Sequence, residues 1–260
     1  PEIVTRRFDF STFSVEELPF AEAQEKAETR RRELADWMEA ARHYRQAMAV
    51  GSERLERNLE LEALAAVLDG GLPVVVLAHG EREIREAIEF AEAQGLEMIL
   101  AGGREAWKVK GLLAEKGIPV ILGQTQSLPS EEDEAYDAPF RNPGELVAAG
   151  VKIAFASGAG GGFGPGGPHG SRTTPYEAAT AVPYGLPPEA ALKAVTLWPA
   201  EILGVADRLG SIEPGKLGNL IVTDGDPLAI TTAIEYLVID GRIASSDNRH
   251  RRLYETYRAR

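Results

Sequence analysis

The sequence predicts an α/β fold built on a parallel sheet, because apolar runs alternate with amphipathic helical segments across short connections. The predicted strands are residues 73–77, 98–101, 119–122 and 151–156. Continuous apolar runs of this length are expected for parallel strands that are covered on both faces. The connections imply right-handed crossovers, but periodicity leaves open whether the strands close into a (β/α)8 barrel or lie in an open doubly wound sheet.

Two helices are expected before the first strand. Apolar residues recur at helical spacing through residues 20–50, which predicts one long amphipathic helix. A second helix is predicted over residues 53–68, where leucines form a broad apolar stripe and Gly70-Gly71 supplies the stop signal. Residues 1–70 are therefore interpreted as a helical lead-in.

The remaining helices follow the strands in alternation, which makes residues 71–207 the β/α portion of the chain. A long acidic loop, residues 124–142, comes after the third strand, and a glycine-rich loop comes after the fourth. Helices are predicted over residues 81–94, 105–116, 143–149, 176–184 and 188–203.

The chain changes character after residue 207. Turn signals at Pro214-Gly215 and Asp224-Gly225 surround a short apolar run at 219–223, and a second run follows at 236–239. Such spacing is typical of short strands joined by tight turns. Residues 208–245 are predicted to be a small β-element, and residues 246–260 a terminal helix.

Composition excludes several classes of partner and of site. A net charge of −12 argues against nucleic acid as a partner, and no apolar run is long enough to span a membrane. The first residues show neither a basic segment nor an apolar segment of a secretory signal. Because there are no cysteines, disulfides, thiolate metal sites and cysteine nucleophiles are excluded.

The glycine-rich loop formally contains a nucleotide-binding pattern. Residues 162–167 fit G-x-G-x-x-G and follow a strand, as such a site requires. However, Pro165 and Pro168 lack the backbone N–H groups that would hold a phosphate, and no helix begins at the third glycine. A flexible loop is favoured, and a doubly wound nucleotide-binding domain is kept only as a third hypothesis.

The C-terminal motifs carry a family resemblance. The segment EAALKAVTLWPAEILG at 189–204, followed by LGSIEPGK at 209–216, resembles the amidohydrolase superfamily, in its imidazolonepropionase-like group. The resemblance implies a (β/α)8 barrel of the TIM type, of which residues 73–156 correspond to strands five to eight, the second half. It also implies that residues 208–245 belong to a β-sandwich.

In that family, divalent metal is held by histidines at the ends of strands one, five and six. An aspartate after strand eight takes a proton from the attacking water, whose pKa the metal lowers. The resemblance places Leu77 or His79 at the strand-five position of this chain and Gly102 at the strand-six position. Gly158, after Ser157, stands where the aspartate is expected, and no His-x-His pair occurs.

The residues that remain at these strand ends give the expected site. His79 and Ser157 are the candidate catalytic residues, and His79 is the one candidate metal ligand. A substrate pocket lined by His79, Gly102, Ser157, His169 and Arg172 is expected above the strand ends. We expect no cofactor, and a divalent metal such as zinc is the alternative.

The leading hypothesis is a catalytically degenerate, metal-free pseudoenzyme that serves as a binding or assembly subunit. The alternative is a metal-dependent hydrolase of non-peptide C–N bonds, completed by a missing N-terminal segment or by a partner chain. A half-barrel exposes open sheet edges, which predicts a homo-oligomer or a complex with another amidohydrolase-like chain. The resemblance also suggests export to the periplasm, as for many relatives.

Overall fold

The computed structural model describes residues 6–9, 14–17, 19–51, 56–123, 125–129, 133–157, 172–245, 247 and 249–259. The chain divides into two compact units, residues 1–120 and 121–260, and the division falls within strand β5. The first unit contains β1 (Arg6–Asp9), β2 (Ser14–Glu17), α1 (Phe20–Val50), α2 (Leu59–Leu68), β3 (Val74–Ala78), α3 (Glu81–Gln94), β4 (Met98–Gly102), η1 (Ala106–Val109), α4 (Lys110–Glu115) and the start of β5 (Val120–Leu122).

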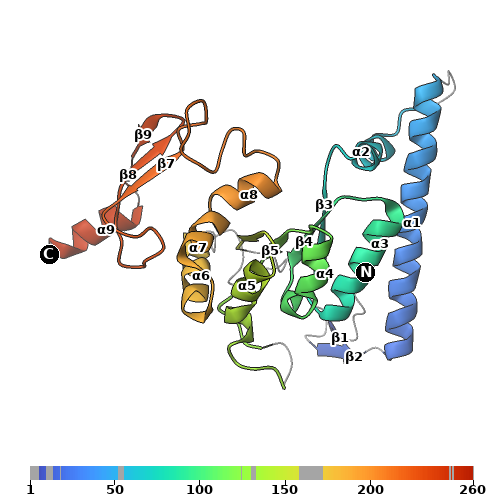
Figure 1. The fold of residues 1–260 in the computed structure, drawn as a ribbon, viewed down its shortest axis with the longest axis horizontal. Helices are drawn as coiled ribbons and strands as arrows, with labels where there is room; N and C mark the ends of the chain where they lie inside the picture. Colours follow the sequence, from blue (N-terminus) through green and yellow to red (C-terminus); the bar gives the residue numbers. More distant parts are fainter. Residues whose placement is uncertain are drawn as a thin grey trace. The chain divides into compact units, whose positions relative to one another are not determined.

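Helices α1 and α2 confirm that helices lie near the ranges predicted at 20–50 and 53–68, whereas the antiparallel pairing of β1 with β2 was not predicted. Helix α1 ends at Gly51, which adopts the left-handed conformation that stops a helix. Helix α2 begins later than predicted because the Asn58 side chain caps it, accepting hydrogen bonds from the N–H groups of Glu60 and Leu61. Helix α1 lies alongside α3 (Figure 1), where Arg42 donates to the carbonyl of Gln94.

The four predicted strands form one sheet in the order β3-β4-β5-β6, which confirms the α/β fold. Strands β3 and β4 pair in parallel, with Val74 opposite Met98. Strand β4 is buried along its whole length. Strand β3 lies at one edge of the described sheet, and Val75 and Leu77 are 54% and 55% exposed. Its apolar sequence is therefore covered on one face only.

In the second unit, helices α5 to α8 pack around β6 (Ile153–Phe155), and a small antiparallel sheet follows them in the chain. Helices α5 to α8 all contact β6 or one another. Strands β7, β8 and β9 form a separate sheet in that order, and β9 was not predicted. The elements are α5 (Ala138–Ala148), α6 (Thr174–Ala181), η3 (Val182–Tyr184), α7 (Pro188–Ala194), α8 (Leu197–Ile202), β7 (Leu220–Thr223), β8 (Ile234–Ile239), β9 (Arg242–Ala244) and α9 (Arg249–Arg258).

Two predicted helix boundaries were wrong, and both lie close to a proline in the sequence. Helix α5 begins at Ala138 rather than at Pro143, and Pro143 lies inside the helix although it removes one hydrogen bond. The single helix predicted over residues 188–203 is interrupted at Val195 and Thr196. Pro199 cannot donate to the carbonyl of Val195, so a continuous helix is unfavourable there.

Among the residues that the structure describes, no helix combines the length and the apolar character needed to cross a membrane. The export suggested by the resemblance stays a prediction.

We predict that Gly144→Ala destabilises the second unit. A Cβ on Gly144 of α5 would lie 2.8 Å from the carbonyl carbon of Gly185 and 2.9 Å from the nitrogen of Leu186. Backbone atoms cannot move aside as a side chain can, so we expect a loss of about 1–3 kcal/mol in urea unfolding. Gly111→Ala is the matched control, because Gly111 is helical and a Cβ there would meet no atom within 4 Å. Equal stabilities of the two variants would contradict the prediction.

Candidate functional site

The carboxyl ends of β3 and β4 bring His79 and Gly102, two of the predicted pocket residues, into contact. The parallel pairing continues beyond the strands, because Gly103 donates to the carbonyl of Ala78 at 2.8 Å and Glu105 donates to that of His79 at 2.9 Å. These two bonds hold the turns that follow β3 and β4 side by side. The backbone that carries the half-buried His79 side chain is therefore held by the parallel pairing.

The imidazole of His79 fills the space beside the backbone of Gly102. Gly102 has φ +92°, a conformation that side chains rarely adopt. A Cβ at this position would lie 2.6 Å from Cε1 and 2.8 Å from Nδ1 of His79. A histidine at position 102, the ligand that the resemblance implies, would collide with His79 in this arrangement.

Two carboxylates accept hydrogen bonds at the N-terminus of α3, which directly follows His79 and Gly80. Glu83 accepts hydrogen bonds from the N–H groups of His79 (3.0 Å) and Gly80 (3.2 Å). Glu105 reaches across from the turn after β4 and accepts from the N–H of Glu81 at 2.7 Å. Helix N-termini favour negative charge, so both side chains stabilise the β3–α3 junction. The N–H groups of His79, Gly80 and Glu81 are therefore already engaged by these carboxylates.

Glu105 is 8% exposed and is ionised in this environment. Burial, the largest single influence, raises the pKa of its carboxyl group. The ammonium group of Lys108, which donates to Glu105 at 2.7 Å, and the N–H of Glu81 act in the opposite direction. With the charge of Arg104, they leave the pKa of Glu105 below its ordinary value.

A second buried carboxylate, Glu177 on α6, organises the strand ends of the second unit. It accepts hydrogen bonds from the N–H (2.7 Å) and the hydroxyl (2.6 Å) of Thr125, and from the N–H of Gln126 at 3.1 Å. Glu177 is 7% exposed and Thr125 is 3% exposed. This contact fixes the turn that follows β5 onto the helix that follows the glycine-rich loop.

Sequence reasoning missed the contact between Glu177 and Thr125. The available signal was that Glu177 shares the buried face of α6 with Ala178 and Ala181. An acidic residue on the buried face of a helix requires hydrogen-bond donors from elsewhere in the fold. The sequence does not say which segment supplies them.

The other predicted site residues are only partly described. Ser157 follows β6 in the second unit, where Ala156 donates to the carbonyl of Leu122 at 3.0 Å. Arg172 is exposed at the start of a short helical turn. His169, Gly158 and the glycine pattern at 162–167 lie outside the described residues. The predicted pocket shared by these residues therefore stays a prediction.

The described strand ends do not fit the divalent metal that the resemblance implies. Within the parts of the chain that the structure describes, no three histidine, aspartate or glutamate side chains form a group that could hold a metal ion. At position 102, where a ligand is expected, a side chain would overlap His79. Glu83 and Glu105, the nearby carboxylates, are engaged by backbone N–H groups.

We predict that Gly102→Ala costs about 3 kcal/mol in urea unfolding. The left-handed backbone contributes about 1–2 kcal/mol, and the overlap with His79 adds about 1–3 kcal/mol. Gly95→Ala is the matched control, because Gly95 has φ +67° but a Cβ there would meet nothing within 4 Å. Adding His79→Ala to Gly102→Ala should recover part of the loss. If the loss is the same as for Gly95→Ala, the imidazole does not fill this space.

Glu105→Gln should remove part of the dependence of stability on pH. Because the folded-state pKa of Glu105 is lowered, its stabilisation is present above the unfolded-state value of 4.5 and is lost as the pH falls through the lower folded-state value. The wild-type chain should therefore be the more stable at pH 7, and the two proteins should converge below pH 4.5. Urea unfolding from pH 7 to pH 3 measures this. A constant difference across that range would contradict the assignment.

Comparison with known proteins identifies the family. Residues 22–245 match the profile of the amidohydrolase family. The crystal structure of an amidohydrolase from Thermotoga maritima aligns with a TM-score of 0.70 and 31% identity, over 83% of this chain and 55% of the other. A second amidohydrolase crystal structure aligns with a TM-score of 0.55 at 19% identity, over 81% of this chain and 58% of the other, a similarity of fold alone.

Amidohydrolase tasK of Hapsidospora irregularis is 44% identical over 71 residues, which are 27% of this chain and 7% of that protein. This chain thus spans little more than half the length of the two solved structures and a small part of the curated relative. The match to the family profile covers most of the sequence and agrees with the C-terminal motifs. The chain belongs to the amidohydrolase family, and its partial coverage of these relatives fits a C-terminal portion of such a protein.

Proposed function

We propose that this chain is a catalytically degenerate amidohydrolase, a metal-free pseudoenzyme that serves as a binding or assembly subunit. The observation that carries the proposal is the contact between His79 and Gly102. An imidazole occupies the space into which the strand-six ligand would project, so the substitution by glycine is built into the packing of the strand ends. If Gly102 replaced a ligand but left the space beside it empty, the support for a pseudoenzyme would be weaker.

The strand-eight position supports the same proposal from the sequence. Gly158 stands where the resemblance expects the aspartate that activates water. Glycine has no side chain that can accept a proton, so this step would need a base from another position. Ser157 beside it is a poor base at neutral pH without an activating partner.

The proposed partner is a second copy of this chain or another amidohydrolase-like chain. In this proposal β3 to β6 correspond to barrel strands five to eight, and β7 to β9 belong to a β-sandwich. Support comes from the edge position of β3, where Val75 and Leu77 are exposed although the strand is apolar throughout. An exposed apolar edge strand favours pairing with another chain.

A second candidate is a metal-dependent hydrolase of non-peptide C–N bonds that is completed by residues outside this sequence. The position of His79 at the carboxyl end of a parallel strand favours it, because catalytic residues of β/α barrels lie at that end. Additional ligands would have to come from a preceding segment or from the partner. Even then, Gly102 and Gly158 would leave two of the expected positions without a side chain.

Metal analysis and mass measurement on the same preparation test these proposals together. We expect the chain, produced with added zinc, iron and manganese, to retain far less than one metal ion per chain. We also expect light scattering to report a mass of at least two chains. Val75→Lys should reduce that mass, because it places a charge on the exposed face of β3. Val50→Lys is the control, since Val50 is 86% exposed at the end of α1.

Stoichiometric metal that is lost in His79→Ala would overturn the pseudoenzyme and favour the hydrolase. Absence of metal from the complete assembly would exclude the hydrolase. If the wild-type chain is a compact monomer, the proposed partner is contradicted. The metal content would then still decide between the pseudoenzyme and the hydrolase.

A further inference from the structure

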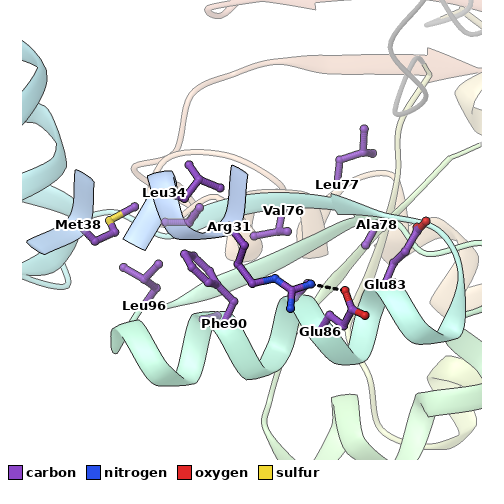
Figure 2. Close-up of a pocket in the computed structure, with 13 residues that line it drawn as sticks. Arg31, Leu34, Met38, Val76, Leu77, Ala78, Glu83, Glu86, Phe90 and Leu96 are labelled. Carbon is purple, nitrogen blue, oxygen red and sulfur yellow. Dashed lines mark hydrogen bonds and ion pairs between the residues drawn. The ribbon is translucent and has the colours of Figure 1, made fainter. Parts of the chain in front are cut away.

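A cavity lies on the helix-covered side of β3, between that strand, α1 and α3. Its volume is about 180 Å³. Figure 2 shows the residues that line it. The wall is mostly apolar, with Leu34 and Met38 from α1, Val76 from β3, Phe90 from α3 and Leu96 after it. All three elements belong to the first unit. Along the apolar part of this wall water would lack hydrogen-bond partners, which favours a hydrocarbon group there.

One ion pair marks the polar end of the cavity. The guanidinium of Arg31 on α1 donates to the carboxylate of Glu86 on α3, as Figure 2 shows. Both side chains are partly exposed, at 37% and 29%. Glu83 also lines the cavity, but its carboxylate is held by the N–H groups that precede α3. Arg31 is the one cationic side chain among the described residues that line the cavity.

Glu86 has a second cation beside it. Nε of Arg82 lies 3.8 Å from the other carboxylate oxygen of Glu86. If a ligand carboxylate replaces Glu86 as the partner of Arg31, Glu86 keeps the charge of Arg82. The exchange leaves no carboxylate without a cation, and partly exposed ion pairs of this kind are weak enough to exchange. Planar carboxylates also match the guanidinium in geometry.

We propose that this cavity binds a small apolar monocarboxylate, with its hydrocarbon part against Met38 and Phe90 and its carboxylate on Arg31. At about 30 Å³ for a water-sized group, the volume holds about six non-hydrogen atoms. This is the size of a short aliphatic chain or of one aromatic ring. The site is independent of the proposed function, because it uses neither His79 nor Gly102.

Titration of the full 260-residue chain with hexanoate, followed by amide chemical shifts and by calorimetry, tests the site. Hexanamide has the same shape without the charge and is the ligand control. Ala87→Leu fills the cavity with a side chain that helices favour, because Ala87 lines it. Ala93→Leu makes the same change at an exposed position of α3 and is the matched control. Arg31→Gln removes the positive charge and keeps an uncharged polar side chain.

We expect saturable binding of one hexanoate per chain, with shift changes confined to α1, β3 and α3. Affinity should be lost in Ala87→Leu, kept in Ala93→Leu and reduced at least tenfold in Arg31→Gln. Hexanamide should bind at least tenfold more weakly than hexanoate. No binding at millimolar hexanoate, equal binding of the two ligands, or shift changes spread over other elements would each overturn the proposal. If Ala87→Leu does not fold, the shift map and Arg31→Gln decide the question.

Discussion

The close approach of the His79 imidazole to the backbone of Gly102 constrains the end of the sheet where an amidohydrolase performs its chemistry. This approach is possible only because residue 102 is a glycine with a positive φ angle. It leaves no space for a side chain at position 102. The parallel hydrogen bonds that continue past β3 and β4 keep the two turns in register, so the contact does not depend on loop motion.

Three acidic side chains near the described strand ends stabilise the fold through hydrogen bonds to the backbone. Glu83 and Glu105 accept hydrogen bonds at the N-terminus of α3, and Glu177 accepts three from the turn after β5. A buried carboxylate without hydrogen-bond donors would lower the stability of the fold. Because these carboxylates have donors, they fix the turns that carry Thr125 and His79. The hydrogen bonds of these three carboxylates are thus accounted for by the turns and the helix end that they hold.

Strand β3 links this site to the two proposals on binding. Its side chains alternate between the face covered by α3 and the opposite face, on which Val75 and Leu77 are exposed. The exposed face favours a partner chain. On the covered face, α1 and α3 do not fill the space completely, and the remaining cavity is bounded by the ion pair of Arg31 and Glu86.

The sequence by itself determined the α/β alternation, the helices at 20–50 and 81–94, and the family, because apolar periodicity and the motif at 189–204 are local features. It also shows glycine at positions 102 and 158, where the resemblance expects a metal ligand and a general base. Only the tertiary structure decided that His79 packs on Gly102 and that Glu177 holds Thr125, 52 residues away in sequence. These contacts join segments far apart in the chain, and hydrogen-bond geometry between such segments has no signature in a single sequence.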